Sequence, residues 1–357
     1  MKQIFKADAL PVLTGSLPVK DHNEAVKIML KYTPEIPMWA QLPVYPEERM
    51  MSQFLKGMPG LTVEGDHEFI DTEKQSFQDE LTAFYEEYIA VTEGGADISK
   101  TRFALSPDVA KGFFTLIDEV PERLNGQKAV KGQITGPVTL AVGVTQTNGR
   151  SLFYDEQIRD AVVKLIALKA GFQVKKLSAL CKPVIIFLDE PTLAGLGSSE
   201  LISISQDEMT ACFEEVFDEI HAQGGLAGVH VCANMDWSVV LESSADIINF
   251  DAYSYFEKFI LYPDQIKAFI ESGRILAWGI VPTQCVDDIE RETVDSLVVK
   301  WNDQANAISK LGIDMKTILS QSLISPSCGS GTLSIQHAAK VLELTRGVSD
   351  VLRRGLK

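Results

Sequence analysis

The chain has 357 residues, 45% of them hydrophobic, and a formal net charge of -16. A chain of this size buries a large core, either as one α/β barrel with insertions or as two domains. Its strong negative charge repels nucleic acid and anionic membranes, so we expect neither as a partner. We also expect no signal peptide and no membrane span, because no apolar run approaches the roughly 18 residues that a span requires.

The five cysteines are an odd number in a large chain, which is not the pattern of a disulfide framework. We therefore expect a reducing, cytoplasmic compartment, in which thiolates stay available to bind a metal. Cys181 and Cys212 are interpreted as small buried hydrophobic residues. Cys285 follows an expected strand and stays an outside candidate as a ligand.

A short apolar run, then polar or Gly/Pro residues, then an amphipathic stretch recurs along the chain. This alternation predicts parallel strands joined by helices. Eight runs qualify as strands: residues 12–16, 38–42, 129–135, 184–188, 227–231, 247–250, 275–280 and 317–324. We therefore predict an α/β fold, a (β/α)8 TIM barrel that forms a single domain over residues 1–357.

The second and third expected strands are separated by residues 43–128, far more than an ordinary loop. This long insertion includes a helical stretch at residues 77–92. It is interpreted either as a lid over the barrel mouth or as a passive decoration of the barrel side. Residues 333–352 have regularly spaced apolar residues between charged ones, which predicts an amphipathic final helix.

Several expected strands end in polar residues that core packing does not need. In an eight-stranded barrel the carboxyl ends of the strands hold the active site. The residues at these ends are Ser16, Gln41, Asp189, Glu190, His230, Cys232, Asp251 and Cys328. Asp189 has an alternative interpretation as a helix N-cap before Pro191.

His230 and Cys232 are two residues apart, so they face the same way from one strand. Cys328 follows another strand and a Pro-Ser turn, and Gly329 and Gly331 allow the backbone to bend sharply behind it. Zinc binds Cys sulfur and His nitrogen, and catalytic sites keep one position exchangeable. The pattern predicts a zinc site assembled by the fold. The alternative is an ordinary core histidine beside a buried cysteine.

The fourth position of this zinc site is expected to hold water or a carboxylate. Asp251 follows the strand between the His230 strand and the Cys328 strand and is the candidate, with a helix cap or a rim charge as the alternative. A zinc ion with two thiolates and one exchangeable position is suited to activating a thiol substrate. The residues therefore predict a zinc-dependent methyltransferase that acts on a thiol.

Five motifs, in this order, resemble the catalytic half of cobalamin-independent methionine synthase, within the uroporphyrinogen decarboxylase-like superfamily. The resemblance extends over nearly the whole chain. The motifs are residues 14–18 (TGSLP), 132–137 (GQITGP), 188–191 (LDEP), 230–232 (HVC) and 325–329 (SPSCG).

The resemblance implies roles for individual residues. His230, Cys232 and Cys328 would be the zinc ligands, with Asp251 where that family normally has Glu. Ser16 and Asp189 would hold the polar end of an amino-acid thiol such as homocysteine, and Asp189 is also the predicted catalytic residue. The further expected substrate contacts are Gln41, Thr135 and Glu190.

The resemblance leaves the methyl donor and the acceptor open. Methyltetrahydrofolate is one donor, and a methylcobamide carried by a corrinoid partner protein is the other. Homocysteine, coenzyme M and similar small thiols all fit as the acceptor. The sequence departs from the family pattern at Asp251 and in the residues that follow Cys328.

Two rival interpretations stay open. A metal-free decarboxylase of the same superfamily would act on a tetrapyrrole rich in carboxylates and would rely on arginines near its N-terminus, but the first arginine here is Arg49. A non-catalytic protein with structural zinc, docking a corrinoid protein, would need four firm ligands, and Asp251 argues instead for an open position.

Overall fold

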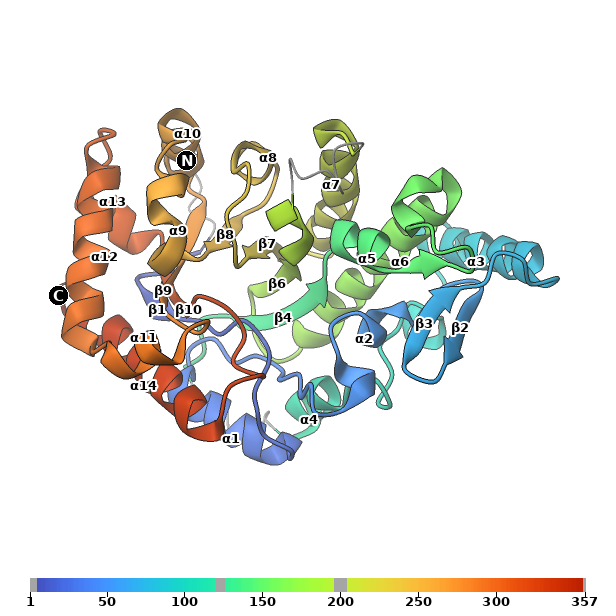
Figure 1. Cartoon of the computed structure of the whole chain (residues 1–357), viewed down its shortest axis with the longest axis horizontal. Helices are drawn as coiled ribbons and strands as arrows, with labels where there is room; N and C mark the ends of the chain where they lie inside the picture. The colour runs from blue at the N-terminus through green and yellow to red at the C-terminus, as the bar shows by residue number, and fades with distance from the viewer. Residues whose placement is uncertain (1–4, 120–125, 196–203, 356–357) are drawn as a thin grey trace.

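A parallel sheet of seven strands lies at the centre of the molecule (Figure 1). The structure, a computed structural model, describes residues 5–119, 126–195 and 204–355. The strand order is β1-β10-β9-β8-β7-β6-β4, and each neighbouring pair is parallel. The strands are β1 (Leu10–Pro11), β4 (Val130–Thr135), β6 (Val184–Asp189), β7 (Leu226–Val231), β8 (Ile247–Phe250), β9 (Ile275–Val281) and β10 (Ser322–Pro326).

The predicted α/β class and the parallel order of the strands are confirmed. Three of the eight expected strands differ, and two of them lie near the start of the chain. The first is only β1, which ends before residues 12–16, and residues 38–42 form no strand. That segment instead makes isolated parallel bridges, Met38 to Lys131 and Gln41 to Ser16. The sheet is therefore a seven-stranded half-barrel. The closed eight-stranded barrel that we predicted would need residues 38–42 as a further strand, and they do not form one.

Side chains of β4 make hydrogen bonds to the segments at residues 12–16 and 38–42, where the first two strands were expected. The Lys131 ammonium donates to the carbonyl oxygen of Thr14 at 2.6 Å. The Gln133 amide donates to the carbonyl oxygen of Trp39 at 2.8 Å. Trp39 in turn donates its indole N–H to Gln173 at 2.9 Å. These buried bonds satisfy backbone groups that a regular ladder would otherwise pair.

The strand expected at residues 317–324 is wrong in its first half. Residues Met315–Ser320 form the helix α13, and β10 begins only at Ser322. Asp314 caps this helix, because its carboxylate accepts from the backbone N–H of Thr317 at 2.9 Å. The apolar residues of this run suited both a helix and a strand, and the Asp314 cap favours the helix.

Helices follow the strands and cover the sheet (Figure 1). The predicted final helix is confirmed as α14, which begins after the N-cap Ser334. Among the described residues, no helix is both long and apolar enough to cross a membrane. The helices are α1 (His22–Tyr32), α5 (Pro137–Gly143), α6 (Glu156–Leu177), α7 (Gln206–Ala222), α8 (Ser238–Leu241), α9 (Ala252–Phe259), α10 (Pro263–Glu271), α11 (Val286–Arg291), α12 (Val294–Ser309) and α14 (Ile335–Arg354).

Part of the long segment before β4 builds a projection at one end of the molecule, where β2, β3 and α3 lie on the right in Figure 1. Its strands β2 and β3 pair with the short β5 in a separate three-stranded sheet. The helix α3 forms where predicted and packs beside α6, where the Tyr85 hydroxyl donates to Asp160 at 2.7 Å. The elements are α2 (Ser52–Leu55), β2 (Leu61–Glu64), β3 (His67–Ile70), α3 (Phe77–Thr92), α4 (Lys111–Glu119) and β5 (Thr145–Gln146).

Candidate metal centre

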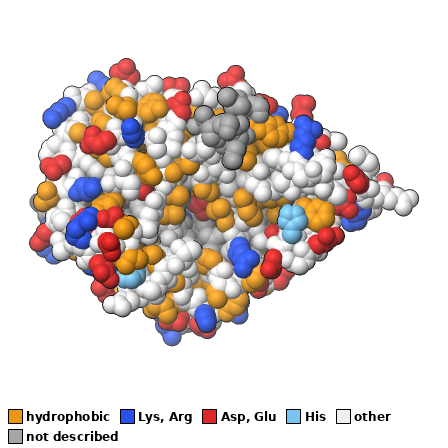
Figure 2. Space-filling view, viewed as in Figure 1, with side chains coloured by type: hydrophobic (Ala, Val, Ile, Leu, Met, Phe, Trp, Pro, Cys, Tyr) orange, Lys and Arg blue, Asp and Glu red, His pale blue; other side chains and the backbone are white. Residues whose placement is uncertain are grey.

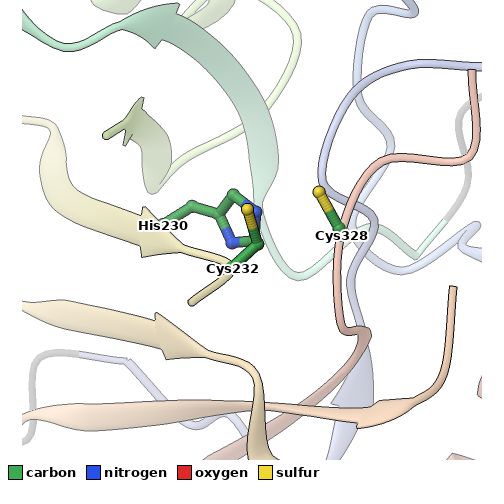
Figure 3. Close-up of side chains that lie close together, drawn as sticks. All are labelled: His230, Cys232 and Cys328. Atoms are coloured by element: carbon green, nitrogen blue, oxygen red, sulfur yellow. The ribbon is translucent and has the colours of Figure 1, made fainter. Parts of the chain in front are cut away.

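Three side chains that could bind a metal ion, one histidine and two cysteines, meet at the carboxyl ends of β7 and β10 (Figure 3). His230 is the penultimate residue of β7, Cys232 follows the strand, and Cys328 lies on the loop after β10. One ligand atom from each, a ring nitrogen and two sulfurs, lies within 4.8 Å of the others. The sequence predicted that these three residues lie close together, and the fold does bring their ligand atoms together.

The His230 ring is the clearest sign that this group is built for a ligand. It is only 5% exposed, yet neither ring nitrogen has a hydrogen-bond partner in the described part of the chain. A buried polar atom without a partner is costly, so such atoms are rare in folded proteins. A metal ion bound to one of these nitrogens would remove that cost.

The two cysteines influence each other's ionisation. A hydrogen bond from Cys328 is the main cause that lowers the pKa of the Cys232 thiol to about 4, and His230 also lowers it. The same contact, together with burial, raises the pKa of Cys328. Cys232 is therefore the cysteine of the pair that loses its proton more readily, and a thiolate is the form that binds a metal.

Asp251, the expected fourth ligand, lies outside this group of three. It is the N-cap of α9, and one carboxylate oxygen accepts from the backbone N–H of Ser254 at 2.8 Å. Its other oxygen lies 3.5 Å from the side-chain nitrogen of Gln284. Burial is the main cause that raises its pKa to about 6. The carboxylate thus performs the cap role, and its ligand role stays a prediction.

The group of three lines a cavity of about 390 Å³. The molecular face drawn in Figure 2 is hollowed near its centre. Among the expected substrate residues, Ser16, Gln41 and Asp189 line the cavity together with His230, Cys232 and Cys328. Pro43, Pro191 and Gly329 contribute nonpolar surface to the wall of the cavity. The volume suits a small molecule rather than a macromolecule.

Asp189 ends β6 beside His230, its partner in the register of β6 and β7. Its Oδ1 atom is buried and has no hydrogen-bond partner among the residues described. Burial raises the pKa of this carboxyl to about 6, although His230 and the buried Lys131 act to lower it. The side chain therefore offers an unused acceptor in the cavity wall, and the N-cap alternative does not account for it.

Ser16 supports the Cys328 loop as well as lining the cavity. Its hydroxyl oxygen accepts from the backbone N–H of Gly331 at 3.1 Å. A Cβ atom on Gly329 would lie 2.3 Å from that oxygen, and one on Gly331 would lie 2.8 Å from the Cβ of Ser16. Neither glycine has a positive φ. They are needed for close approach, rather than for the sharp bend that we expected.

Two expected substrate residues do not line the cavity. Thr135 is fully buried, and its hydroxyl donates to the carbonyl oxygen of Met50 at 2.5 Å. Glu190 is fully buried beneath α5 and accepts from the backbone N–H groups of Val138 at 3.0 Å and Thr139 at 2.8 Å. Both side chains are engaged in hydrogen bonds within the protein. A direct substrate contact by either would therefore require these hydrogen bonds to rearrange.

The sequence reasoning missed two parts of the site. Asn249 lies opposite His230 in the register of β7 and β8. Glu48, Arg49 and Met50, which precede the insertion's small sheet, form part of the cavity wall. A polar residue in the middle of an apolar strand is a signal that could have indicated Asn249. No local pattern marks residues 48–50, because only the chain path brings them to the cavity.

The group of three fits a metal ion by its chemistry. It offers two sulfurs and one nitrogen, all soft or borderline ligands, which is the donor set that zinc prefers. With Asp251 engaged as a cap, no fourth His, Cys, Asp or Glu side chain among the described residues belongs to the group. The fold and the site thus define an α/β protein with a small-molecule cavity and a group that could hold a metal ion.

Comparison with known proteins places the fold more closely. No family model matches the sequence, and no curated protein matches it. A methyltransferase from Methanosarcina mazei aligns with a TM-score of 0.52 and 13% identity, over 95% of this chain and 94% of that one. A Listeria monocytogenes protein described as a vitamin-B12-independent methionine synthase aligns with a TM-score of 0.54 and 14% identity, over 92% of this chain and 85% of that one.

A third solved structure is a B12-independent methionine synthase from Shewanella sp. W3-18-1 in complex with selenomethionine. It aligns with a TM-score of 0.47 and 18% identity, over 68% of this chain and 67% of that one, and no argument below depends on it. At such identities a likeness establishes the fold alone. The structural neighbours are methionine synthase-like and methyltransferase structures, as the motifs predicted.

Proposed function

We propose that this chain is a zinc-dependent methyltransferase, with one catalytic domain over residues 1–357. It moves a methyl group from methyltetrahydrofolate or a methylcobamide to a small thiol such as homocysteine. The observation that carries this proposal is the convergence of His230, Cys232 and Cys328 in the wall of a small-molecule cavity. The shared fold with methyltransferase structures supports it.

The chemistry divides between the metal and the chain. His230, Cys232 and Cys328 would hold zinc, whose positive charge would keep a substrate thiol deprotonated near neutral pH. The free acceptor oxygen of Asp189 suits an ammonium group, so it would orient an amino-acid thiol. Ser16 and Gln41 complete the polar wall near the Cys328 loop. The side chains thus position the sulfur, which is the main catalytic task in a direct displacement.

The overall reaction balances without a further reactant. The thiol loses its proton and forms a new sulfur–carbon bond to the methyl group. The bond between that methyl and the donor breaks, and its electron pair stays on the donor nitrogen or on cobalt. With folate as the donor, the leaving amine takes up a proton.

The rival decarboxylase has less support from the cavity. A substrate with several carboxylates calls for several guanidinium groups. Arg49 is the single arginine in the cavity lining, and no lysine accompanies it among the described residues. The rival role as a scaffold with closed structural zinc lacks a fourth convergent ligand in the described chain.

The first test is the zinc content of the protein, measured by elemental mass spectrometry after purification without a chelator. We expect about one zinc per chain in the wild type and a sharp loss in Cys328→Ser, since a structural or catalytic site binds a single ion. Cys285→Ser is the matched control, because Cys285 is exposed and outside the group. Circular dichroism and Tm should stay native-like in both variants.

The second test is methyl transfer by the wild type and Cys328→Ser. Methylcobalamin and methyltetrahydrofolate serve as donors, with homocysteine and 2-mercaptoethanesulfonate as acceptors. We expect transfer in the wild type with one pair and none in Cys328→Ser. No zinc in the wild type, even after incubation with excess metal, would overturn the proposal and favour the decarboxylase. Full activity in a folded Cys328→Ser would overturn the role of that cysteine.

A further inference from the structure

Arg49 is the one cation in the lining of the metal-site cavity, counting only residues that the structure describes. It lies in the segment that follows the Gln41 bridge, between Glu48 and Met50, and all three residues form part of the wall. This segment belongs to no strand of the central sheet. It comes to the cavity from a different part of the chain than the three soft ligands.

The backbone on both sides of Arg49 is firmly held. Glu48 is only 3% exposed, and its carboxylate binds His22 at 2.6 Å and the backbone N–H of Leu42 at 2.8 Å. On the other side, the carbonyl oxygen of Met50 accepts from Thr135 at 2.5 Å. The segment is therefore fixed in place at the cavity, and it carries the Arg49 side chain with it.

The Arg49 guanidinium itself has no hydrogen bond or ion pair with any described residue. Most other described arginines do have such a partner. Examples are the pairs Arg102–Glu87, Arg159–Glu208, Arg291–Asp288 and Arg346–Glu35. The Arg49 side chain is exposed, so in a chain of net charge -16 its guanidinium is open to an incoming anion and is not paired with a carboxylate of a described residue.

The two carboxylates in the cavity lining, those of Glu48 and Asp189, do not neutralise Arg49. Both carboxylate oxygens of Glu48 are engaged, by His22 and by the Leu42 N–H. Asp189 lines the same cavity but forms no ion pair with Arg49. A guanidinium binds carboxylates and other oxyanions through two parallel hydrogen bonds. The Arg49 guanidinium is therefore available to bind an anion that enters the cavity, and the backbone that carries it is held in place.

We propose that Arg49 is an anion-binding subsite of this cavity, and that the thiol substrate carries a carboxylate or another oxyanion remote from its sulfur. This inference rests on the proposed function, in which the sulfur goes to the metal. The substrate then spans from the group of three to Arg49. A neutral thiol of the same size lacks the second contact, so Arg49 determines specificity.

The test compares two thiols that differ only in charge, 3-mercaptopropionate and 3-mercaptopropionamide, on the zinc-loaded full chain. Calorimetry measures the affinity of each. A charged hydrogen-bonded pair corresponds to roughly a 10- to 100-fold preference for the carboxylate in the wild type. We expect Arg49→Met to abolish this preference by weakening the carboxylate alone, and Arg49→Lys to restore part of it.

Arg354→Met is the matched control, because Arg354 also has no partner among the described residues but lies at the end of α14. It should leave both affinities unchanged. Zinc content and Tm should match the wild type in every variant, since the Arg49 side chain has no hydrogen bond or ion pair with any described residue.

The possible outcomes separate this inference from the proposed function. Equal binding of the two thiols by the wild type, unchanged in Arg49→Met, would overturn the subsite and leave the proposed function in place. An equal loss for both thiols in Arg49→Met would also overturn it, because the effect would then be independent of charge. If neither thiol binds the zinc-loaded wild type, that result would count against the proposed function itself and against the subsite that depends on it.

Discussion

His230 and Asn249 occupy paired positions on the neighbouring strands β7 and β8. Asn249 is fully buried, and its amide nitrogen donates to the carbonyl oxygen of Ala277 at 2.9 Å and to Ser325 at 2.7 Å. These bonds orient the amide, and its oxygen is left without a partner in the described structure. It is therefore an acceptor available to a ring N–H of His230. An N–H held in this way determines which ring nitrogen is free to bind a metal.

The first prediction concerns this amide. We expect Asn249→Leu to weaken zinc binding by about 10- to 100-fold, the usual cost of losing a partner behind a metal-bound histidine. Competition with a chelator measures the affinity, and the absorption spectrum of the cobalt-substituted protein reports on the ligand geometry.

A suitable control for Asn249→Leu is Gln321→Leu, which removes another buried amide, one that precedes β10 at its amino end. Gln321 donates to the carbonyl oxygen of Ile270 at 2.8 Å and to that of Arg274 at 2.6 Å. Both variants should lose stability, but only Asn249→Leu should lose zinc affinity. Unchanged zinc affinity in Asn249→Leu would show that the amide only supports the strands.

The second prediction separates the cap role of Asp251 from a ligand role. We expect Asp251→Ala to lower the free energy of unfolding by about 1 kcal/mol, the usual cost of a lost N-cap. It should weaken zinc retention less than Cys232→Ser, since the carboxylate already accepts from Ser254. Zinc content after dialysis against a weak chelator is the measurement. Equal loss of zinc in both variants would mean that Asp251 is a full ligand.

The third prediction concerns the close contact between Gly329 and Ser16. A Cβ at residue 329 would lie 2.3 Å from the Ser16 hydroxyl, so Gly329→Ala must shift either that hydroxyl, which accepts from Gly331, or the loop that carries Cys328. We expect this variant to lose zinc affinity. The double variant Gly329→Ala with Ser16→Gly should recover much of it, because the obstructing side chain is gone. If the second change brings no recovery, the loss has another cause than this contact.

The fourth prediction is a pH dependence of stability that arises from Lys169. This lysine on α6 is 1% exposed, and burial lowers its pKa to about 7 from an ordinary value of 10.5. Between these values the unfolded chain binds more protons than the folded one, so this residue makes stability rise with pH. The contribution is on the order of a few kcal/mol. Urea unfolding from pH 7 to pH 10 measures it.

Lys169→Met should remove this slope and stabilise the protein at pH 7, since it keeps the volume and deletes the buried charge. The difference between variant and wild type isolates Lys169 from the other titrating groups. Identical slopes in the two proteins would show that the lysine escapes to solvent or finds a partner when it is charged.

The agreement between sequence and structure depends on how each element is stabilised. The strand at residues 247–250 was predicted to the residue, because a continuous apolar run between turns suits a buried parallel strand. The segment at residues 38–42 also looked like a strand, but it makes only isolated bridges. Backbone groups of this segment instead form hydrogen bonds with long side chains, such as that of Gln133. No local sequence pattern reveals such a partner.

The sequence by itself determined the parallel α/β class and the metal-type group of His230, Cys232 and Cys328, because strand periodicity and residue chemistry are local properties. The tertiary structure decided what surrounds that group. It engaged Asp251 in a cap, buried Thr135 and Glu190 away from the cavity, and brought Arg49 to its wall. These outcomes depend on how distant segments pack, because each side chain takes the hydrogen-bond partner that the folded chain places within reach.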